Sequence, residues 1–251
     1  MSLHPLAERF ASVAAEYERG RPDYPPALVD LIADALGEAA RPPARVLHLG
    51  AGTGKLTRAL LAGGLDVVAV EPQAALREVL AESVGAERVR DGLAEAIPLA
   101  DASVEAVTVS DAFHWFDHAP ALAEIARVLR PGGALCVVWT IPDWTGASWA
   151  HELGTLMAAL RPEHPAFDGP PWQDAARASG HFGDPREIRV TTARLASPAL
   201  LVDHIASMSW IAAMADRERD QRLVEIRALI EAGETPERMP IHFVLAIAEL
   251  R

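Results

Sequence analysis

Short apolar runs alternate with segments of helical periodicity along the first 142 residues of the chain. The segment at 73–84, for example, repeats its apolar residues at the spacing of one helix face. This alternation predicts an α/β fold, in which parallel strands are joined by right-handed crossovers. We expect strands at five of the apolar runs: 46–49, 66–70, 87–90, 104–109 and 134–139.

The flanking regions follow the same logic less regularly. Residues 1–16 have roughly helical spacing, and a segment rich in glycine and proline, 20–26, separates them from a second helix that ends at Leu36. Residues 121–129 predict a helix that Pro131, Gly132 and Gly133 stop. The C-terminal part predicts, in order, a strand at 186–193, helices at 200–214 and 217–230, and a strand at 239–250.

Three glycines follow the first predicted strand, at Gly50, Gly52 and Gly54. Glycine permits a sharp turn and a close approach of a ligand to the backbone. The amides that open the next helix have no intrahelical acceptor and favour an electron-rich group. Glu71 ends the second strand, where its carboxylate can accept hydrogen bonds from ribose hydroxyls. Together these features predict a site for a cofactor that contains a nucleoside.

The spacing of the glycines separates three classes of cofactor. A phosphate-binding NTPase loop requires a glycine where this chain has Leu49, and Ser or Thr where it has Leu56. A dinucleotide loop requires G-x-G-x-x-G, but Lys55 occupies the position of the last glycine. Both alternatives therefore fit the loop poorly.

Composition restricts the partners. The 251 residues carry a formal net charge of −12 with no basic run, which argues against nucleic acid and anionic membranes. No apolar run is long enough to span a membrane, and the N-terminus does not resemble a signal peptide. The one cysteine, Cys136, lies in an apolar run, which predicts an inert, buried thiol, and no disulfide framework is expected. These features predict a cytoplasmic protein that acts on a small molecule.

The loop HLGAGTG resembles motif I of the class I S-adenosylmethionine (SAM)-dependent methyltransferases. His48 stands where that family has an acid that helps to hold the aminoacyl end of SAM. A histidine there can donate to the carboxylate, act through water or weaken binding. GLAEAIPL resembles the adenine-binding segment of the family, with Leu93 where many relatives have an acid. The resemblance implies cofactor contacts from Tyr17, Arg21, His48, Gly50, Ala51, Gly52, Gly54, Glu71, Pro72, Leu93, Ala94, Glu95 and Ser110.

Two further segments resemble one branch of the family, which is related to trans-aconitate methyltransferases. They are YERGRPDYP, before motif I, and AFHWFD, after the fourth strand. The resemblance implies that His114 lies near the transferred methyl group, as a base if the acceptor must lose a proton, although a purely structural histidine is an equal alternative. His114 and His118 lack a third ligand, so no metal is expected. The residues implied for the acceptor are Tyr24, His114, Trp115, Trp139 and Trp144.

The chain is therefore similar to class I methyltransferases of the type 11 group. This resemblance implies a Rossmann-like, doubly wound three-layer sandwich with a mostly parallel seven-stranded sheet and an antiparallel strand near the C-terminal end. It implies in-line methyl transfer from SAM to a carboxylate, hydroxyl, amine or carbon, with S-adenosylhomocysteine as product, in a monomer or homodimer. A catalytically silent SAM-binding or interaction protein and an NAD-dependent Rossmann enzyme are the alternatives.

Within one methyltransferase domain, 1–251, we expect four parts. These are an N-terminal lid and first helix at 1–36, a SAM-binding core at 37–142, a substrate-cap insertion at 143–185 and a C-terminal completion of the sheet with helices at 186–251.

Overall fold

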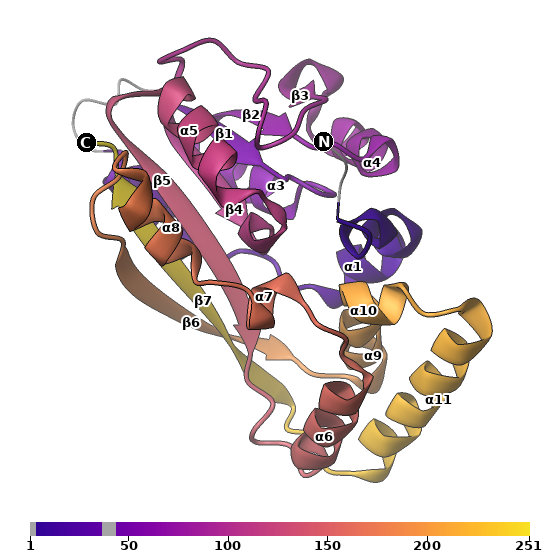
Figure 1. Cartoon of the computed structure of the whole chain (residues 1–251). Helices are drawn as coiled ribbons and strands as arrows, with labels where there is room; N and C mark the ends of the chain where they lie inside the picture. The colour runs from indigo at the N-terminus through magenta and orange to yellow at the C-terminus, as the bar shows by residue number, and fades with distance from the viewer. Residues whose placement is uncertain (1–3, 37–43) are drawn as a thin grey trace. The chain divides into compact units, whose positions relative to one another are not determined.

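A computed structural model describes residues 4–36 and 44–251 of the chain (Figure 1). Its centre is a seven-stranded sheet with the order β3-β2-β1-β4-β5-β7-β6. Residues 1–3, at the start of the predicted N-terminal lid, and 37–43, at the start of the predicted SAM-binding core, lie outside the described residues. The strands are β1 (Arg45–Leu49), β2 (Asp66–Val70), β3 (Val89–Arg90), β4 (Val104–Ser110), β5 (Leu129–Pro142), β6 (Arg186–Leu195) and β7 (Arg238–Glu249).

The pairing of the strands fixes their directions. β1 pairs in parallel with β2 and with β4, and the parallel pairing continues to β3 on one side and β5 on the other. The hydrogen bonds between β5 and β7 join the two strands in opposite directions. Leu250 donates to Gly133, whereas Asp143, ten residues after Gly133, donates to Pro240, which precedes Leu250 in the chain. β7 is therefore antiparallel to β5, and the predicted Rossmann-like fold is confirmed.

The described residues divide into two compact units. The first unit comprises 4–22, 141–167 and 191–242, and the second comprises 23–36, 44–140, 168–190 and 243–251. The helices of the second unit are α2 (Pro26–Ala35), α3 (Lys55–Ala62), α4 (Ala74–Val84), η2 (Ala86–Arg88), η3 (Phe113–Trp115), α5 (His118–Val128) and α8 (Trp172–Ser179). Those of the first unit are η1 (Ala7–Val13), α1 (Ala14–Gly20), α6 (Ala150–Leu160), α9 (Pro198–Ala206), α10 (Ser209–Ala212) and α11 (Asp216–Ala232), and α7 (Pro165–Asp168) crosses the boundary.

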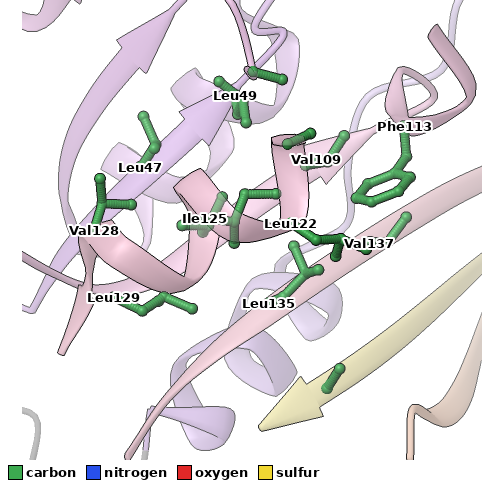
Figure 2. Packing of buried hydrophobic residues seen from close by; sticks show 14 of the residues in the cluster. Leu47, Leu49, Val109, Phe113, Leu122, Ile125, Val128, Leu129, Leu135 and Val137 are labelled. Atoms are coloured by element: carbon green, nitrogen blue, oxygen red, sulfur yellow. The ribbon is translucent and has the colours of Figure 1, made fainter. Parts of the chain in front are cut away.

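Strand β1 shows how the second unit acquires its layers. Leu47 and Leu49 belong to the main apolar cluster, which α5 joins through Leu122 and Ile125 (Figure 2). His48, between the two leucines, points to the other face, where it contacts α3. Because successive side chains of a strand alternate between faces, α5 and α3 cover opposite faces of the sheet. Full burial of both faces explains the near-continuous apolar runs of the sequence.

The segment LRPGG differs from its prediction as a turn. Residues 129–133 form the first part of β5, and the pairing of β5 with β4 shifts register between Val104 and Ala106. Gly132 has a φ of 79°, and a Cβ on Gly133 would lie 2.7 Å from the carbonyl oxygen of Glu105. The glycines therefore permit an irregular strand pressed against β4, rather than a turn before a strand.

Two other boundaries also differ from the sequence prediction. The helix expected at 200–214 is divided into α9 and α10, because Met208 has an extended backbone with a ψ of 135°. The strand expected at 87–90 is short, since residues 86–88 form the 3-10 helix η2. The predicted strand at 186–193 is β6, and the final predicted strand is β7.

Cys136 lies in the middle of β5 and is fully buried. Burial raises the pKa of its thiol to about 12. The prediction of an inert, buried thiol is consistent with this position.

In the first unit, α1 and α9 pack closely at a glycine. A Cβ on Gly20 would lie 2.3 Å from the amide nitrogen of His204, so only glycine fits at the end of α1 without a shift of the backbone. Arg19 reinforces the pair with a 2.8 Å ion pair to Asp203. No helix within the described residues combines the length and apolar character that crossing a membrane requires.

Candidate functional site

The glycine turn lies at the carboxyl end of β1, where the order of the strands in the sheet reverses. β2 follows β1 on one side, whereas β4 lies on the other side, so a crevice is expected between the ends of β1 and β4. Gly50, Gly52 and Gly54 all have a positive φ, at 68°, 56° and 92°. The amides of Gly50 and Ala51 both donate to the carbonyl of Val70, at 2.9 and 3.1 Å, which ties the turn to β2.

The three glycines have different surroundings. A Cβ on Gly54 would lie 2.5 Å from a methyl carbon of Leu80, so Gly54 allows α3 and α4 to pack closely. A Cβ on Gly50 would lie 3.0 Å from that of Ala112. At Gly52 a Cβ would meet nothing within 4 Å. Gly52 therefore leaves space over the turn that no described side chain fills.

Glu71 follows β2 and is 4% exposed. Its Oε2 accepts a 2.8 Å hydrogen bond from the amide of Gly52, and its Oε1 accepts one of 3.0 Å from the amide of Gln73. Burial raises the pKa of this carboxyl, and the two amide bonds oppose that shift. Arg77 donates to the backbone carbonyls of Glu71 and Pro72, which holds the chain after β2. The predicted acid thus lies directly beside the glycine turn.

His48 is buried beneath the turn, with 2% exposure. Its Nδ1 lies 2.7 Å from the hydroxyl oxygen of Thr57 in α3. Its Nε2 is buried and has no hydrogen-bond partner among the described residues. Burial lowers the pKa of His48 to about 3, so the ring is neutral at physiological pH. A neutral imidazole with one unused polar atom therefore replaces the carboxylate of motif I.

The predicted adenine segment is a compact turn. Leu93 and Ala96 form an isolated antiparallel bridge, and Ala94 between them is buried. Glu95 accepts a 2.8 Å hydrogen bond from the amide of Asp117, so its carboxylate joins this turn to the start of α5. Arg127 of α5 donates to the carbonyls of Ile97 and Leu99, which fixes the rest of the segment.

Tyr24 and Ser110 meet at the carboxyl end of β4. The phenol oxygen of Tyr24 forms a short hydrogen bond with the hydroxyl oxygen of Ser110, and the Tyr24 ring packs against Phe243 with centroids 5.5 Å apart. Next to it, Asp23 forms a 2.7 Å ion pair with Lys55, the residue after Gly54. Asp23 and Tyr24 thus join the chain before α2 to the start of α3 and to the end of β4.

An aromatic cluster lies just beyond β4, in and around η3. The ring of His114 stacks on Trp139 with centroids 5.4 Å apart and contacts Trp115 at 4.4 Å. The ring of His118 packs instead on Phe113, at 5.3 Å, and burial lowers the pKa of His118. No group of three potential metal-ligating side chains converges in the part of the chain that the structure describes.

Three predicted site residues, Tyr17, Arg21 and Trp144, belong to the first unit. The guanidinium of Arg21 lies 5.4 Å from the centre of the Tyr17 ring and donates to the hydroxyl of Ser207. Trp144 packs edge-on against His204, with centroids 5.6 Å apart. Their roles toward a cofactor or an acceptor stay predictions.

Sequence reasoning missed four residues around the turn and β4. Thr57 is the partner of His48, and Asp23 and Lys55 form the ion pair described above. Asp111 has a left-handed backbone with a φ of 49°, directly after β4. The DY pair before P-P and the lysine after motif I offered no signal of pairing, because the contact joins residues 32 positions apart.

The fold and the turn together define a class of protein. A parallel sheet with a glycine-rich turn after β1 and an acid at the end of β2 is the arrangement that binds nucleoside cofactors at a switch point. A solved protein of Anaeromyxobacter dehalogenans, named as a type II methyltransferase, shares this fold with a TM-score of 0.63. That match covers 92% of this chain and 97% of the other, at 24% identity.

Comparison of sequences identifies the family. The model of the methyltransferase domain matches residues 47–137. An uncharacterized methyltransferase of Mycobacterium tuberculosis is 41% identical over 229 residues, which cover 91% of this chain and 88% of that protein. An uncharacterized methyltransferase-like protein of Schizosaccharomyces pombe is 32% identical over 219 residues, or 86% and 84% of the two chains. The chain belongs to the methyltransferase family, and the predicted class, a SAM-dependent methyltransferase of the type 11 group, is confirmed.

Proposed function

We propose that this enzyme transfers the methyl group of SAM to a small-molecule acceptor and releases S-adenosylhomocysteine. The observation that carries the proposal is the pairing of the buried Glu71 carboxylate with the open space over Gly52. An acid and an unobstructed backbone at one switch point suit a ribose and the chain attached to it. The family match supports the same cofactor.

Different residues of the second unit bind different parts of the cofactor. Glu71 accepts from the ribose hydroxyls, since each carboxylate oxygen has capacity for a second hydrogen bond. The turn at Gly50 to Gly54 receives the methionyl side, with the unused Nε2 of His48 below it. Leu93, Ala94 and Glu95 flank the adenine, where an apolar contact of Leu93 replaces the acid of many relatives.

Bound SAM supplies a methyl group that its positively charged sulfur has already activated. The protein mainly has to align the acceptor and exclude water. The aromatic rings of Trp115 and Trp139 form apolar walls, and the Tyr24 hydroxyl, which is bonded to the cofactor candidate Ser110, can bond to an acceptor oxygen or nitrogen. His114 acts as a base where the acceptor is a hydroxyl, an amine or a carbon acid, and a carboxylate acceptor needs none.

A second candidate is a protein that binds SAM weakly and is catalytically silent. The observation that favours it is the neutral His48, because a carboxylate would attract the ammonium group of SAM more strongly than an uncharged imidazole does.

The test is a parallel calorimetric titration of the purified protein with SAM, S-adenosylhomocysteine and NAD. We expect micromolar binding of the two sulfur nucleosides and none of NAD, followed by methyl transfer in a screen of small carboxylic acids, phenols and amines. Binding without any transfer would favour the silent protein. Failure of both sulfur nucleosides to bind would overturn the proposal.

A further inference from the structure

Asp111 is the residue that links the end of β4 to the end of β5. Its backbone amide donates to the carbonyl of Val138 at 3.0 Å, and its Oδ1 accepts a 2.9 Å hydrogen bond from the amide of Thr140. The two bonds lie on either side of Trp139. Asp111 therefore fixes the backbone that carries this ring.

The backbone of Asp111 is also unusual. Its φ of 49° lies in the left-handed region, which L residues other than glycine, asparagine and aspartate rarely adopt. This turn ends β4 and sends the chain into η3, where His114 stands three residues later. Left-handed residues of this kind concentrate at functional sites, where the surrounding structure holds them in place.

The two chain segments that Asp111 joins carry the two rings of one stacked pair. His114 lies on η3, three residues after Asp111, and Trp139 immediately precedes the donor Thr140 on β5. The stacking of these rings, at 5.4 Å and an interplanar angle of 26°, requires both segments to keep their relative position.

We propose that Asp111 is a positioning residue that holds the His114 ring against Trp139 by clamping the end of β4 to the end of β5. It does so through its left-handed turn and through its side-chain bond to Thr140. The consequence for methyl transfer rests on the proposed function, in which these two rings face the acceptor.

The two contributions can be separated by substitution. Asp111→Gly keeps the left-handed backbone and removes the acceptor for Thr140. Asp111→Asn keeps both, because asparagine tolerates the same conformation and its carbonyl oxygen accepts a hydrogen bond. The readout is the ring-proton resonance of His114 by NMR. His114→Asn identifies this resonance, and Trp139→Leu gives the displacement that follows when the tryptophan ring is absent.

We expect Asp111→Gly to move the His114 resonance by more than half of the Trp139→Leu displacement and in the same direction. Asp111→Asn should leave it close to the wild-type position. In the Trp139→Leu background, Asp111→Gly should move the His114 resonance little further, because the tryptophan ring that Asp111→Gly would displace is already absent. A His114 resonance that stays at its wild-type position in Asp111→Gly would overturn the proposal.

Hydrogen exchange of the Thr140 amide provides a second measurement that needs no variant. The amide should be protected in the native wild-type protein, and exchange at the rate of an unprotected amide would also contradict the proposal. Both readouts are separate from cofactor binding. Wild-type protein that fails to bind SAM refutes the proposed function and leaves the NMR result standing, whereas Asp111→Gly should bind S-adenosylhomocysteine as wild type does.

Discussion

The carboxylate of Glu71 and the amide of Gly52 are joined by a 2.8 Å hydrogen bond, so the acid that is proposed to bind ribose also fixes the turn beside it. Replacement of Glu71 by alanine removes both roles. We expect Glu71→Ala to weaken SAM binding by roughly 1–3 kcal/mol, measured by calorimetry.

Glu105→Ala is the matched control for that change. Glu105 also accepts a 2.8 Å bond from a backbone amide, that of Arg45, but at the start of β1. Its loss should leave SAM affinity unchanged. Unchanged affinity in Glu71→Ala would remove Glu71 from the ribose site.

The affinity for SAM should also fall on acidification, because ribose hydroxyls donate best to an ionised carboxylate. Burial raises the pKa of Glu71, so the loss should begin at a higher pH than for an exposed glutamate. Titrations over a series of pH values test this, and the effect should disappear in Glu71→Ala. An acid-induced loss of the same size in that variant would assign the dependence to another group.

Gly52→Ala tests whether the space over the turn receives the cofactor. The matched control is Gly64→Ala, since both glycines have a positive φ, of 56° and 83°, and a Cβ on either meets nothing within 4 Å. Each change should lower the free energy of unfolding by about 1–2 kcal/mol through backbone strain. Only Gly52→Ala should also weaken SAM binding, and equal affinities in the two variants would contradict the proposed position of the cofactor.

His114→Ala should leave the affinity for SAM nearly intact and lower turnover. The expected loss is about 10²–10⁴-fold for an acceptor that must lose a proton, and much smaller for a carboxylate. His118→Ala is the control, because its ring packs on Phe113 rather than on Trp139. A large loss of SAM affinity in His114→Ala would place His114 in the cofactor site instead.

His48 should make the protein less stable in acid. Burial lowers its pKa to about 3 in the folded state, whereas an unfolded histidine titrates near 6.5. Between these two pH values the unfolded chain therefore binds a proton at this position and the folded protein does not. The stability that His48 contributes is complete above about pH 6.5 and falls by about 1.4 kcal/mol per pH unit below it. Buried His204, whose pKa is also lowered, adds to the slope.

Denaturant unfolding at several pH values measures this slope. His48→Asn should reduce it, while the same change at the exposed His151 should not. A slope that is identical in His48→Asn and the wild type would show that His48 titrates normally in the folded protein.

The central strands were predictable because they are buried on both faces, and their apolar runs therefore have the length of the strands themselves. The prediction was wrong at 129–133, where glycine and proline usually indicate a turn. Here Gly133 lies so close to the backbone of Glu105 that a side chain is excluded, and the segment joins the sheet. Local patterns do not reveal a constraint that a neighbouring strand imposes.

The same distinction applies to the site. The distance from Gly50 to Glu71 along the chain follows from one strand, helix and strand, so their proximity was predictable. The left-handed backbone of Asp111 was not, because aspartate also adopts other conformations, and its contact with Thr140 depends on the position of β5. The partners of His48 and Lys55 likewise depend on how the chain folds back on itself.

The position of Cys136 makes its reaction with a thiol reagent a measure of how often the sheet opens. The side chain is fully buried in β5, between β4 and β7, and the sequence has no other cysteine. A thiol-alkylating reagent therefore reacts with the intact protein only as fast as the centre of the sheet separates. The rate of Cys136 modification therefore measures the rate of that opening. A ligand bound at the end of β1 would lower the modification rate in proportion to the fraction of protein that carries the ligand.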